Sequence, residues 1–326
     1  MSAVERPGVA VPDLVAALAE ATGETGACAL DAGVPDAVWN AALLGPAGEL
    51  LARPGKDLRT RFVHAAWHLA GGGAAATPDR LARVIELLHA GSLIVDDVED
   101  GAEQRRGGPA LHRVVGVPLA INTGSWMYFW ALVELIRIGV PGALEAAVTT
   151  LARCHMGQAL DLGARVDRLA MRDVPGVVVA TSRLKTGALC GLATELAALA
   201  AGAPAARIAA LGAFGVEVGV ALQMLDDLGS IVSRHDKARE DLRGARATWP
   251  WAWLAEQADP FAWSRLTGEL AHGDLDQLAA ALADRVTVIG RTQIRATLDA
   301  ALARLAPGTA RDAIAAELHH MEAMYG

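Results

Sequence analysis

The sequence predicts an all-α protein, and three observations support this prediction. Hydrophobic residues make up 53% of the 326 residues, which is enough for a large buried core. Aromatic residues contribute only 4%, whereas alanine and leucine, both strong helix formers, dominate the composition. No segment alternates convincingly between apolar and polar residues as a half-buried strand does. We therefore expect helices to account for nearly all of the regular structure.

Apolar residues at helical spacing, interrupted by Gly, Pro or polar clusters, predict a series of helices along the chain. These helices cover residues 12–22, 36–52, 58–71, 77–100, 117–138, 142–164, 173–201, 205–232, 249–258, 262–284 and 289–324. The helix over 77–100 is long enough to lie at the centre of a bundle. Its interior glycine, Gly91, weakens a helix, so we expect a neighbouring group to need the space there.

Charge, cysteine content and hydropathy exclude several classes of protein. The net charge is -8 and no basic cluster is present, which argues against nucleic-acid binding. The three cysteines, Cys28, Cys154 and Cys190, are odd in number and far apart, unlike a secreted disulfide framework. No uninterrupted run reaches the roughly 18 apolar residues of a membrane-spanning helix. We therefore predict a cytoplasmic protein with no transmembrane segment and no nucleic-acid partner.

Two acidic motifs carry the strongest functional signal. Asp96 and Asp100 are four residues apart, which places them on one helix face, and Asp97 flanks them. Carboxylate oxygens are the ligands that Mg²⁺ prefers, with phosphates and waters completing its octahedron. A solvated acidic helix end is the alternative interpretation of this motif alone. A second pair, Asp226 and Asp227, follows another long apolar run.

Both acidic motifs lie near the C-terminal end of a predicted helix, where negative charge opposes the helix dipole. Such an unfavourable arrangement, found twice in one chain, is more typical of function than of chance. If the two helices lie side by side in a bundle, their carboxylates can face each other across a cavity. Metal ions bound between the carboxylates would then hold one diphosphate, and this would promote ionisation of its C–O bond.

With these acidic motifs in place, the chain resembles the trans-isoprenyl diphosphate synthases, in particular the eukaryotic-type geranylgeranyl diphosphate synthases. The resemblance covers roughly residues 50 to 255 and rests on several motifs in the right order. These motifs are PGKDLR at 54–59, LLHAGSLIVDDVED at 87–100, Arg105-Arg106-Gly107, AINTG at 120–124, QMLDD at 223–227 and EDLRGARATWP at 240–250.

The resemblance implies a single domain over residues 1–326, in which a bundle of helices surrounds a deep cavity, and a homodimer. The C-terminal helices after about residue 260 carry no motif that we can interpret. The implied reaction joins isopentenyl diphosphate to an allylic diphosphate with Mg²⁺, three ions per site when substrate is bound. The implied product is geranylgeranyl diphosphate or a similar prenyl diphosphate.

Specific roles follow from the same resemblance. The implied catalytic residues are Asp96, Asp97, Asp100, Lys185, Thr186, Gln223, Asp226 and Asp227, of which the five aspartates would bind metal. Isopentenyl diphosphate would be held by Lys56, Arg59, His89 and Arg106, and the allylic diphosphate by Arg105, Lys185 and Lys237. Thr186 and Gln223 would lie near the allylic cation, and the other substrate-binding positions are Gln158, Asp161 and Arg246.

The chain departs from the family pattern at two positions. Ser230 stands where the second motif commonly ends in aspartate, which we interpret as a mark of the eukaryotic-type subgroup. Arg246 stands where the pattern has lysine, so the charge is kept while the geometry differs.

Small residues before the first acidic motif predict a product of at least twenty carbons. Gly91 and Ser92 lie about one turn before Asp96, where a growing chain would pass, and bulky aromatics commonly stand there in members that stop at fifteen carbons. Leu88 and Trp126 are candidates for the floor of the cavity.

Two other functions remain open from sequence. A class I terpene cyclase could use the first acidic motif, with Trp126 and Trp130 stabilising cations, although packing is the simpler role for both. The complete set of isopentenyl-binding residues argues against it, since a cyclase holds no second diphosphate. A non-catalytic partner subunit would be expected to lose its acidic motifs, and both are present.

Overall fold

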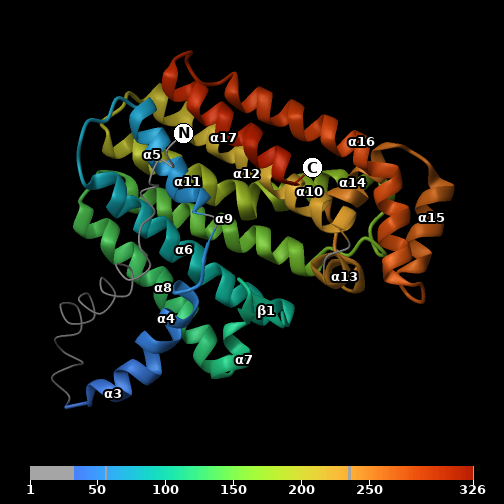
Figure 1. Cartoon of the computed structure of the whole chain (residues 1–326), viewed down its shortest axis with the longest axis horizontal. Helices are drawn as coiled ribbons and strands as arrows, with labels where there is room; N and C mark the ends of the chain where they lie inside the picture. The colour runs from blue at the N-terminus through green and yellow to red at the C-terminus, as the bar shows by residue number, and fades with distance from the viewer. Residues whose placement is uncertain (1–32, 56, 234–235, 326) are drawn as a thin grey trace, which may run out of the picture. The chain divides into compact units, whose positions relative to one another are not determined.

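The structure, a computed structural model, describes residues 33–55, 57–233 and 236–325 (Figure 1). It confirms the all-α prediction, because its only strands in these ranges are the two-residue strands of one small hairpin. The described chain forms two compact units. The first comprises residues up to 64 together with 73–144, and the second comprises 65–72 and 145–326.

The first unit is built around two long antiparallel helices that lie side by side, α6 (Thr77–Asp100) and α8 (Val117–Ile138) (Figure 1). Between them in sequence come the hairpin strands β1 (Gln104–Arg105) and β2 (Gly108–Pro109) and the short helix α7 (Leu111–Val115). The preceding elements are α3 (Asp36–Trp39), the π-helix η1 (Asn40–Leu44), α4 (Gly45–Leu51) and the first residues of α5 (Leu58–Leu69).

The close packing of α6 on α8 explains the interior Gly91. A Cβ atom at Gly91 would lie 2.8 Å from the carbonyl oxygen of Gly124, and one at Gly124 would lie 2.9 Å from that of Gly91. The two glycines therefore face each other and let the two backbones touch. The space that the sequence predicted at Gly91 is taken by the backbone of α8.

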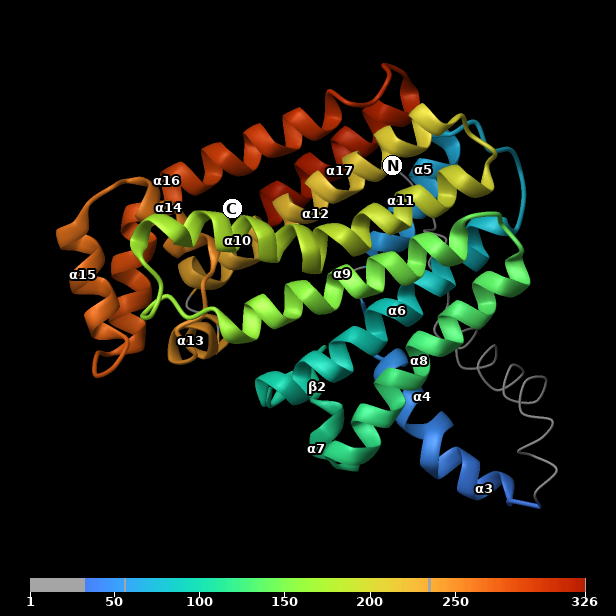
Figure 2. The same cartoon turned by 180° about the vertical axis from the view of Figure 1, so that it is seen from behind.

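The second unit is centred on α12 (Ala205–Ser233), which packs against α11 (Ala188–Ala200) and α16 (Leu275–Leu302). Helix α10 (Val174–Ser182) continues through the π-helix η3 (Arg183–Gly187) into α11 as one helical run (Figure 2). The remaining elements are α9 (Ala143–Gly163), η2 (Met171–Asp173), α13 (Asp236–Arg243), α14 (Trp249–Glu256), α15 (Pro260–Glu269) and α17 (Thr309–Tyr325).

Most of the predicted helices after residue 33 are confirmed to within a few residues, and the predicted helix over 12–22 lies outside the described residues. The predicted boundaries after residue 260 are wrong. Asp274 accepts hydrogen bonds from the backbone N–H groups of Asp276 and Gln277, so a new helix begins at Leu275 and runs through the predicted break near residue 287. The hairpin, α7 and α13 were not predicted, because each is too short to show a periodic pattern.

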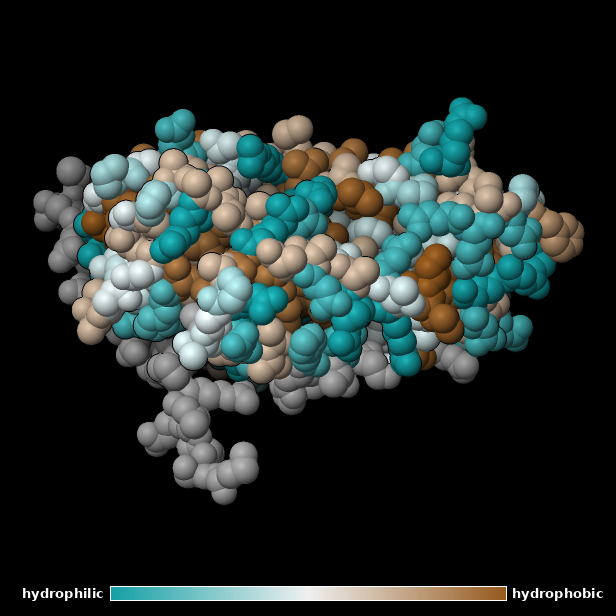
Figure 3. Space-filling view, turned by 90° about the horizontal axis from the view of Figure 1, so that it is seen from above, coloured by the Kyte–Doolittle hydropathy of each residue, from teal (hydrophilic) through white to brown (hydrophobic). Residues whose placement is uncertain are grey.

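Helix α12 is long and apolar enough to cross a membrane by length and composition. Half of its most apolar window is buried inside the protein, where it contacts α11 and α16. A core helix of a large helical unit has the same composition. Hydrophobic and hydrophilic side chains are interspersed on the face of the molecule shown in Figure 3.

Candidate active site

The first acidic motif lies at the C-terminal end of α6. Gly101 ends the helix in the left-handed region, at φ 64°, and the N–H of Ala102 donates to the Asp97 carbonyl oxygen at 2.9 Å. The side chain of Asp96 is 19% exposed, whereas that of Asp97 is 1% exposed. Asp100 is exposed at the helix end. The three carboxylates that the sequence grouped therefore do gather at one end of one helix.

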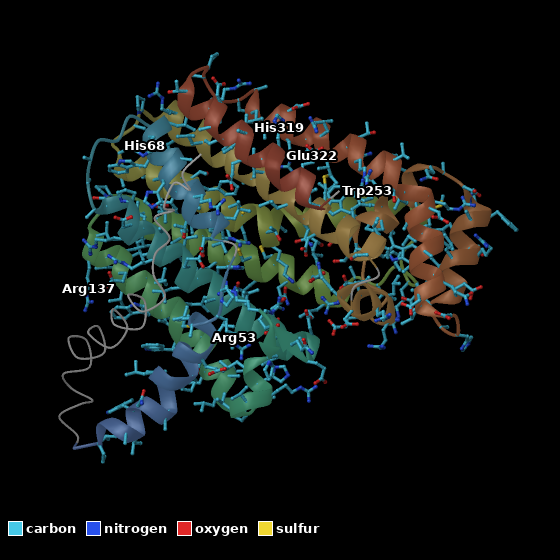
Figure 4. The ribbon with its side chains drawn as sticks, viewed as in Figure 1. Arg53, His68, Arg137, Trp253, His319 and Glu322 are labelled. Atoms are coloured by element: carbon cyan, nitrogen blue, oxygen red, sulfur yellow. The ribbon has the colours of Figure 1, made fainter. Side chains whose placement is uncertain are left out.

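A tight hairpin after α6 brings two arginines to this helix end. Arg106 and Gly107 form its turn with positive φ values of 51° and 77°, the pairing that suits a two-residue hairpin loop. Arg53, labelled in Figure 4, holds the hairpin by donating to the carbonyl oxygens of Arg105 and Pro109, each at 2.7 Å. The hairpin thus has a fixed backbone from which the side chain of Arg105 extends.

Arg105 forms the main ion pair of the first motif. Its Nε donates to Asp97 Oδ1 at 2.7 Å, its Nη2 also donates to Asp97, and Nη2 lies 3.8 Å from Asp96 Oδ2. Burial raises the pKa of Asp97 above its usual range, although Arg105 counteracts this effect. The other oxygen of Asp97, Oδ2, is buried and has no hydrogen-bond partner.

A second cationic cluster lies on the same unit, around His89. The Arg59 Nη1 and His89 Nε2 atoms are 3.1 Å apart, and Arg59 Nε is buried without a hydrogen-bond partner. Desolvation, together with Arg59, Arg106 and Arg105, holds the pKa of His89 well below its usual range, so its ring is neutral near pH 7. The guanidinium of Arg106 lies close to Gly55. Lys56, the fourth predicted member, lies outside the described residues.

Glu86 is a member of this cluster that sequence reasoning missed. Burial raises the pKa of Glu86, while Arg59 and Arg106 lower it. Glu86 lies three residues before His89 on α6, so helical spacing from His89 could have identified it. Glu86 and Asp57 therefore both act electrostatically on Arg106, so carboxyl groups as well as cations belong to this cluster.

The four residues predicted to set chain length differ in environment. Ser92 is half-buried and donates to the His89 carbonyl oxygen at 2.8 Å, whereas Leu88 is fully buried. Gly91 faces the backbone of α8. Trp126 stacks on Trp130, with ring centroids 6.5 Å apart.

In the second unit, the π-helix η3 presents Lys185 to α9. Lys185 Nζ donates to Asp161 Oδ2 at 2.7 Å, and Arg246 Nη1 donates to the same oxygen at 3.1 Å. Gln158 lies one turn before Asp161 on α9. A Cβ at Gly157 would lie 2.6 Å from the Lys185 backbone nitrogen, so this glycine permits the close approach of α9 to η3. The predicted residues Lys185, Asp161 and Arg246 are therefore brought together.

The second acidic pair lies on α12, with Lys237 of α13 across from it. Lys237 Nζ is 2.5 Å from Asp226 Oδ2 and 3.5 Å from Asp227 Oδ1. Desolvation opposes the charge on Lys237, but Asp227, Asp226 and Asp241 outweigh it and raise the pKa of the lysine. Thr186 donates to Gln223 Oε1 at 2.7 Å, and Gln223 Nε2 donates to Asp227 Oδ1 at 2.8 Å. These predicted residues also form one cluster.

Asp241 and Trp249 were not assigned a role from sequence, although both lie in the segment EDLRGARATWP. Burial raises the pKa of Asp241 to about 7, partly offset by Lys237, and its Oδ1 lies 3.9 Å from Arg246 Nε. The backbone N–H of Trp249 donates to Asp227 Oδ2 at 3.1 Å. No periodic pattern indicates contacts between residues so far apart in the chain.

The donor sets fit Mg²⁺ bound together with a diphosphate. No group of three or more His, Cys, Asp or Glu side chains forms a complete metal cage in the described ranges. Mg²⁺ is typically held by one or two carboxylates, with phosphate and water supplying the other ligands. Asp96 and Asp226 provide accessible carboxylate oxygens, and the orphan Oδ2 of Asp97 adds an acceptor beside Asp96.

A fold of long packed helices with two acidic pairs, each beside a basic side chain, defines a helical protein suited to binding metal and diphosphate. The polyprenyl synthetase family model matches residues 40–282, and the chain belongs to this family. The match covers the whole of both acidic motifs and the basic residues around them.

Similar proteins agree with this assignment. The chain is 36% identical over 163 residues to a geranylgeranyl pyrophosphate synthase of Penicillium canescens, covering 48% of this chain and 46% of the relative. It is 30% identical over 210 residues to one of Apiospora sacchari, covering 64% and 62%. The chain spans about half the length of the first relatives it matches.

Solved structures confirm the fold. A polyprenyl synthase from Caulobacter crescentus, complexed with calcium and isoprenyl diphosphate, matches with a TM-score of 0.75 at 24% identity and covers 98% of each chain. A geranylgeranyl pyrophosphate synthetase from Pyrococcus horikoshii matches with a TM-score of 0.74 at 23% identity, covering 96% of this chain and 98% of that chain.

Proposed function

We propose that this protein is a prenyltransferase that condenses isopentenyl diphosphate with an allylic diphosphate to make geranylgeranyl diphosphate or a similar prenyl diphosphate. The observation that carries the proposal is the cationic cluster of Arg59, His89 and Arg106 beside, but separate from, the carboxylates at the end of α6. A diphosphate bound directly by cations and another bound through metal ions need these two different sites. The named relatives support the product class.

The proposed reaction assigns distinct tasks to the side chains. Arg59, Arg106 and Lys56 would bind isopentenyl diphosphate directly, with neutral His89 as a hydrogen-bonding neighbour. Lys185 and Lys237 would donate to the allylic diphosphate and stabilise the charge that grows on it as it leaves. In the structure each lysine donates to a carboxylate, so binding would exchange a carboxylate acceptor for a phosphate oxygen.

The hydroxyl and amide oxygens of Thr186 and Gln223 would stabilise the allylic cation without reacting with it. The double bond of isopentenyl diphosphate would then form the new C–C bond, and a proton would leave to the released diphosphate. The position of Lys185 would be supported by Gln158, Asp161 and Arg246.

The family is Mg²⁺-dependent in general. We propose three ions per site, held by Asp96, Asp97, Asp100, Asp226 and Asp227 with the diphosphates. When bound, the ions neutralise the leaving diphosphate and so favour C–O ionisation.

We further propose that residues 1–326 act as one functional domain, because the family match runs through both compact units. A cytoplasmic location without a membrane span stays a prediction from the sequence.

An apolar stripe on α8 supports a homodimer. Val117, Ile121, Phe129 and Ile136 are spaced by about whole turns and are all exposed, Phe129 by 69% and Ile136 by 61%. Large exposed apolar side chains on one helix face are typical of an interface. We expect the mass from light scattering to be that of a dimer, and Phe129→Glu to lower it to that of a monomer.

The cyclase alternative gains little from the tryptophans of α8. Trp130 is buried, and the guanidinium of Arg137 lies 5.1 Å from the centroid of its ring, so a cation already occupies that position. The non-catalytic alternative would leave both acidic pairs without a role.

Incubation of the purified protein with labelled isopentenyl diphosphate, Mg²⁺ and each allylic primer in turn tests the proposal. We expect a labelled product of about twenty carbons after phosphatase treatment and chromatography. Cyclic hydrocarbons formed from the primer alone would support the cyclase instead, and no product with any primer would support the non-catalytic subunit.

A further inference from the structure

A closed series of hydrogen bonds connects the π-helix η3 with the acidic pair on α12. Thr186 of η3 donates to Gln223, and Gln223 donates to Asp227 Oδ1. The other oxygen of Asp227 accepts from the backbone N–H of Trp249, the first residue of α14. Both oxygens of this carboxylate therefore have a defined hydrogen-bond partner.

Trp249 also returns the series to its starting point. Its indole Nε1 donates to Ser182 Oγ at 2.9 Å, and both residues are only 3% exposed. Ser182 is the last residue of α10 and directly precedes η3. One residue thus holds Asp227 through its backbone and the start of η3 through its side chain.

The start of α14 depends on the acidic pair rather than on its own cap. Thr248, the N-cap residue of α14, makes no side-chain capping bond. Asp227 supplies the missing acceptor from α12, and a carboxylate at a helix N-terminus is favoured by the helix dipole. The orientation of the Asp227 carboxylate is therefore coupled to the position of α14.

Close backbone packing makes η3 move as one rigid segment when one of its ends is displaced. A Cβ atom at Gly219 would lie 2.7 Å from Gly187 Cα, and one at Gly157 would lie 2.6 Å from the Lys185 nitrogen. The π-helix is thus held between the backbones of α12 and α9. A displacement at Ser182 is transmitted to Lys185, because the packed interior leaves no space to absorb it.

We propose that Trp249 is a positioning residue that fixes the register between η3, which carries Lys185 and Thr186, and Asp227 of the second acidic motif. The inference rests on the proposed function only for its kinetic consequence. Trp249 itself takes no part in the chemistry and acts through the groups that it holds.

Trp249→Phe and Ser182→Ala each remove the indole hydrogen bond while keeping most of the packing. Trp253→Phe is the matched control, since Trp253 lies on the same helix (Figure 4), is fully buried, and donates to Gln293 Oε1 at 2.8 Å toward α16. Ser182→Thr keeps the hydroxyl group and tests rescue. Each variant is compared with the wild type for melting temperature, for kcat and KM, and for thermal stabilisation by Mg²⁺ with inorganic pyrophosphate.

We expect Trp249→Phe and Trp253→Phe to lower the melting temperature by similar amounts, because each loses one hydrogen bond from an indole N–H group. Only Trp249→Phe and Ser182→Ala should lower kcat, by about tenfold, and raise the pyrophosphate concentration for half-maximal stabilisation. The KM for isopentenyl diphosphate should stay unchanged, and Ser182→Thr should recover most of the loss.

Equal effects of Trp249→Phe and Trp253→Phe on kcat and on the pyrophosphate response would overturn the inference, as would independent, additive effects in the Trp249→Phe/Ser182→Ala double variant. If Trp249→Phe does not fold, Ser182→Ala tests the same bond. If the wild type shows no prenyl transfer, the proposed function fails, but the pyrophosphate response still decides the inference.

Discussion

The two acidic pairs have the same pattern of side-chain exposure but differ in the hydrogen bonds that position them. In each pair the first aspartate is accessible and the second is buried: side-chain exposure is 19% and 1% for Asp96 and Asp97, and 44% and 5% for Asp226 and Asp227. Asp97 leaves one oxygen without a partner, whereas both oxygens of Asp227 accept hydrogen bonds. The first pair is thus positioned by its own helix and the hairpin that follows it. The second is positioned by its own helix α12 and by η3, α13 and α14.

This difference indicates a division of labour within each pair. The accessible aspartates present the more open oxygens for binding metal, and the buried ones additionally hold basic side chains and helix ends in place. The contrast between the pairs predicts that substitutions at the first motif act locally, while those around Asp227 also disturb η3 and α14.

Replacing an accessible aspartate should have the largest effect. Asp96→Ala and Asp226→Ala should each lower kcat by at least about 100-fold, because each would remove a carboxylate ligand of the metal ions that neutralise the leaving diphosphate. The melting temperature should change little, since neither side chain fills the core. Steady-state kinetics with scanning calorimetry provides the measurement, and Glu99→Ala, exposed on the same turn of α6, is the control.

Replacing a buried aspartate distinguishes the two roles. Asp97→Ala should lower the melting temperature more than Asp96→Ala does, because it leaves the guanidinium of Arg105 without its main partner. Near-normal elongation by Asp96→Ala, or equal melting temperatures for the two variants, would contradict the division of labour.

Substitutions in the cationic cluster around His89 should weaken the binding of only one substrate, isopentenyl diphosphate. Arg59→Ala, like Lys56→Ala, should raise the KM for isopentenyl diphosphate by about 10- to 100-fold, the loss expected for a buried charge-assisted contact. The KM for the allylic primer should change far less. Arg61→Ala, two residues further along α5, is the control for loss of one positive charge. An equal loss for both substrates would show that Arg59 has a structural role.

The structure separates the effects of Gly91 and Ser92. Gly91→Ala should destabilise the protein by about 1–3 kcal/mol, because its Cβ would press on the Gly124 carbonyl. Ser92→Phe, at a half-buried position beside His89, should instead shorten the product toward fifteen carbons. Denaturant unfolding and product chromatography measure the two effects, with Ser92→Ala as the control. An unchanged product from Ser92→Phe would show that the chain grows in another direction.

The smallest expected effect concerns Asp241, whose pKa is raised to about 7 by burial. The pKa of an aspartate in an unfolded chain is about 3.9, so the folded state binds the proton more tightly. The stability that this group provides is therefore complete below about pH 4 and lost as the pH rises through about 7. Asp241→Asn, which stays neutral, should melt higher than the wild type by about 2–4 °C at pH 8 and equally at pH 4.

Thermal melts of both proteins across this pH range test the prediction. The exposed Asp173→Asn is the control for removing one negative charge. A difference in melting temperature that is constant with pH would show that Asp241 is ionised throughout.

Much of the fold and the first motif could be predicted from sequence because the information is local. Helical periodicity gave the helix over 117–138 its observed bounds, and four-residue spacing grouped Asp96 with Asp100. The C-terminal boundaries could not be found in this way, since they depend on whether Asp274 accepts backbone hydrogen bonds. Trp249 donates to Asp227 from 22 residues away along the chain and Thr186 donates to Gln223 from 37 residues away, and no periodic pattern indicates such contacts.

The π-helix has a consequence for how this region tolerates insertions and deletions. A π-helix arises when one extra residue is accommodated within an α-helix, and such π-helices are frequent at functional sites. Deleting any one residue from 183–187 would let α10 and α11 join as an uninterrupted α-helix, but would rotate one relative to the other by about 100°. Either the glycine contacts that seat η3 or the bond from Ser182 to Trp249 would then be lost. The length of the chain over residues 183–187 is thus under constraint in addition to the identities of Lys185 and Thr186.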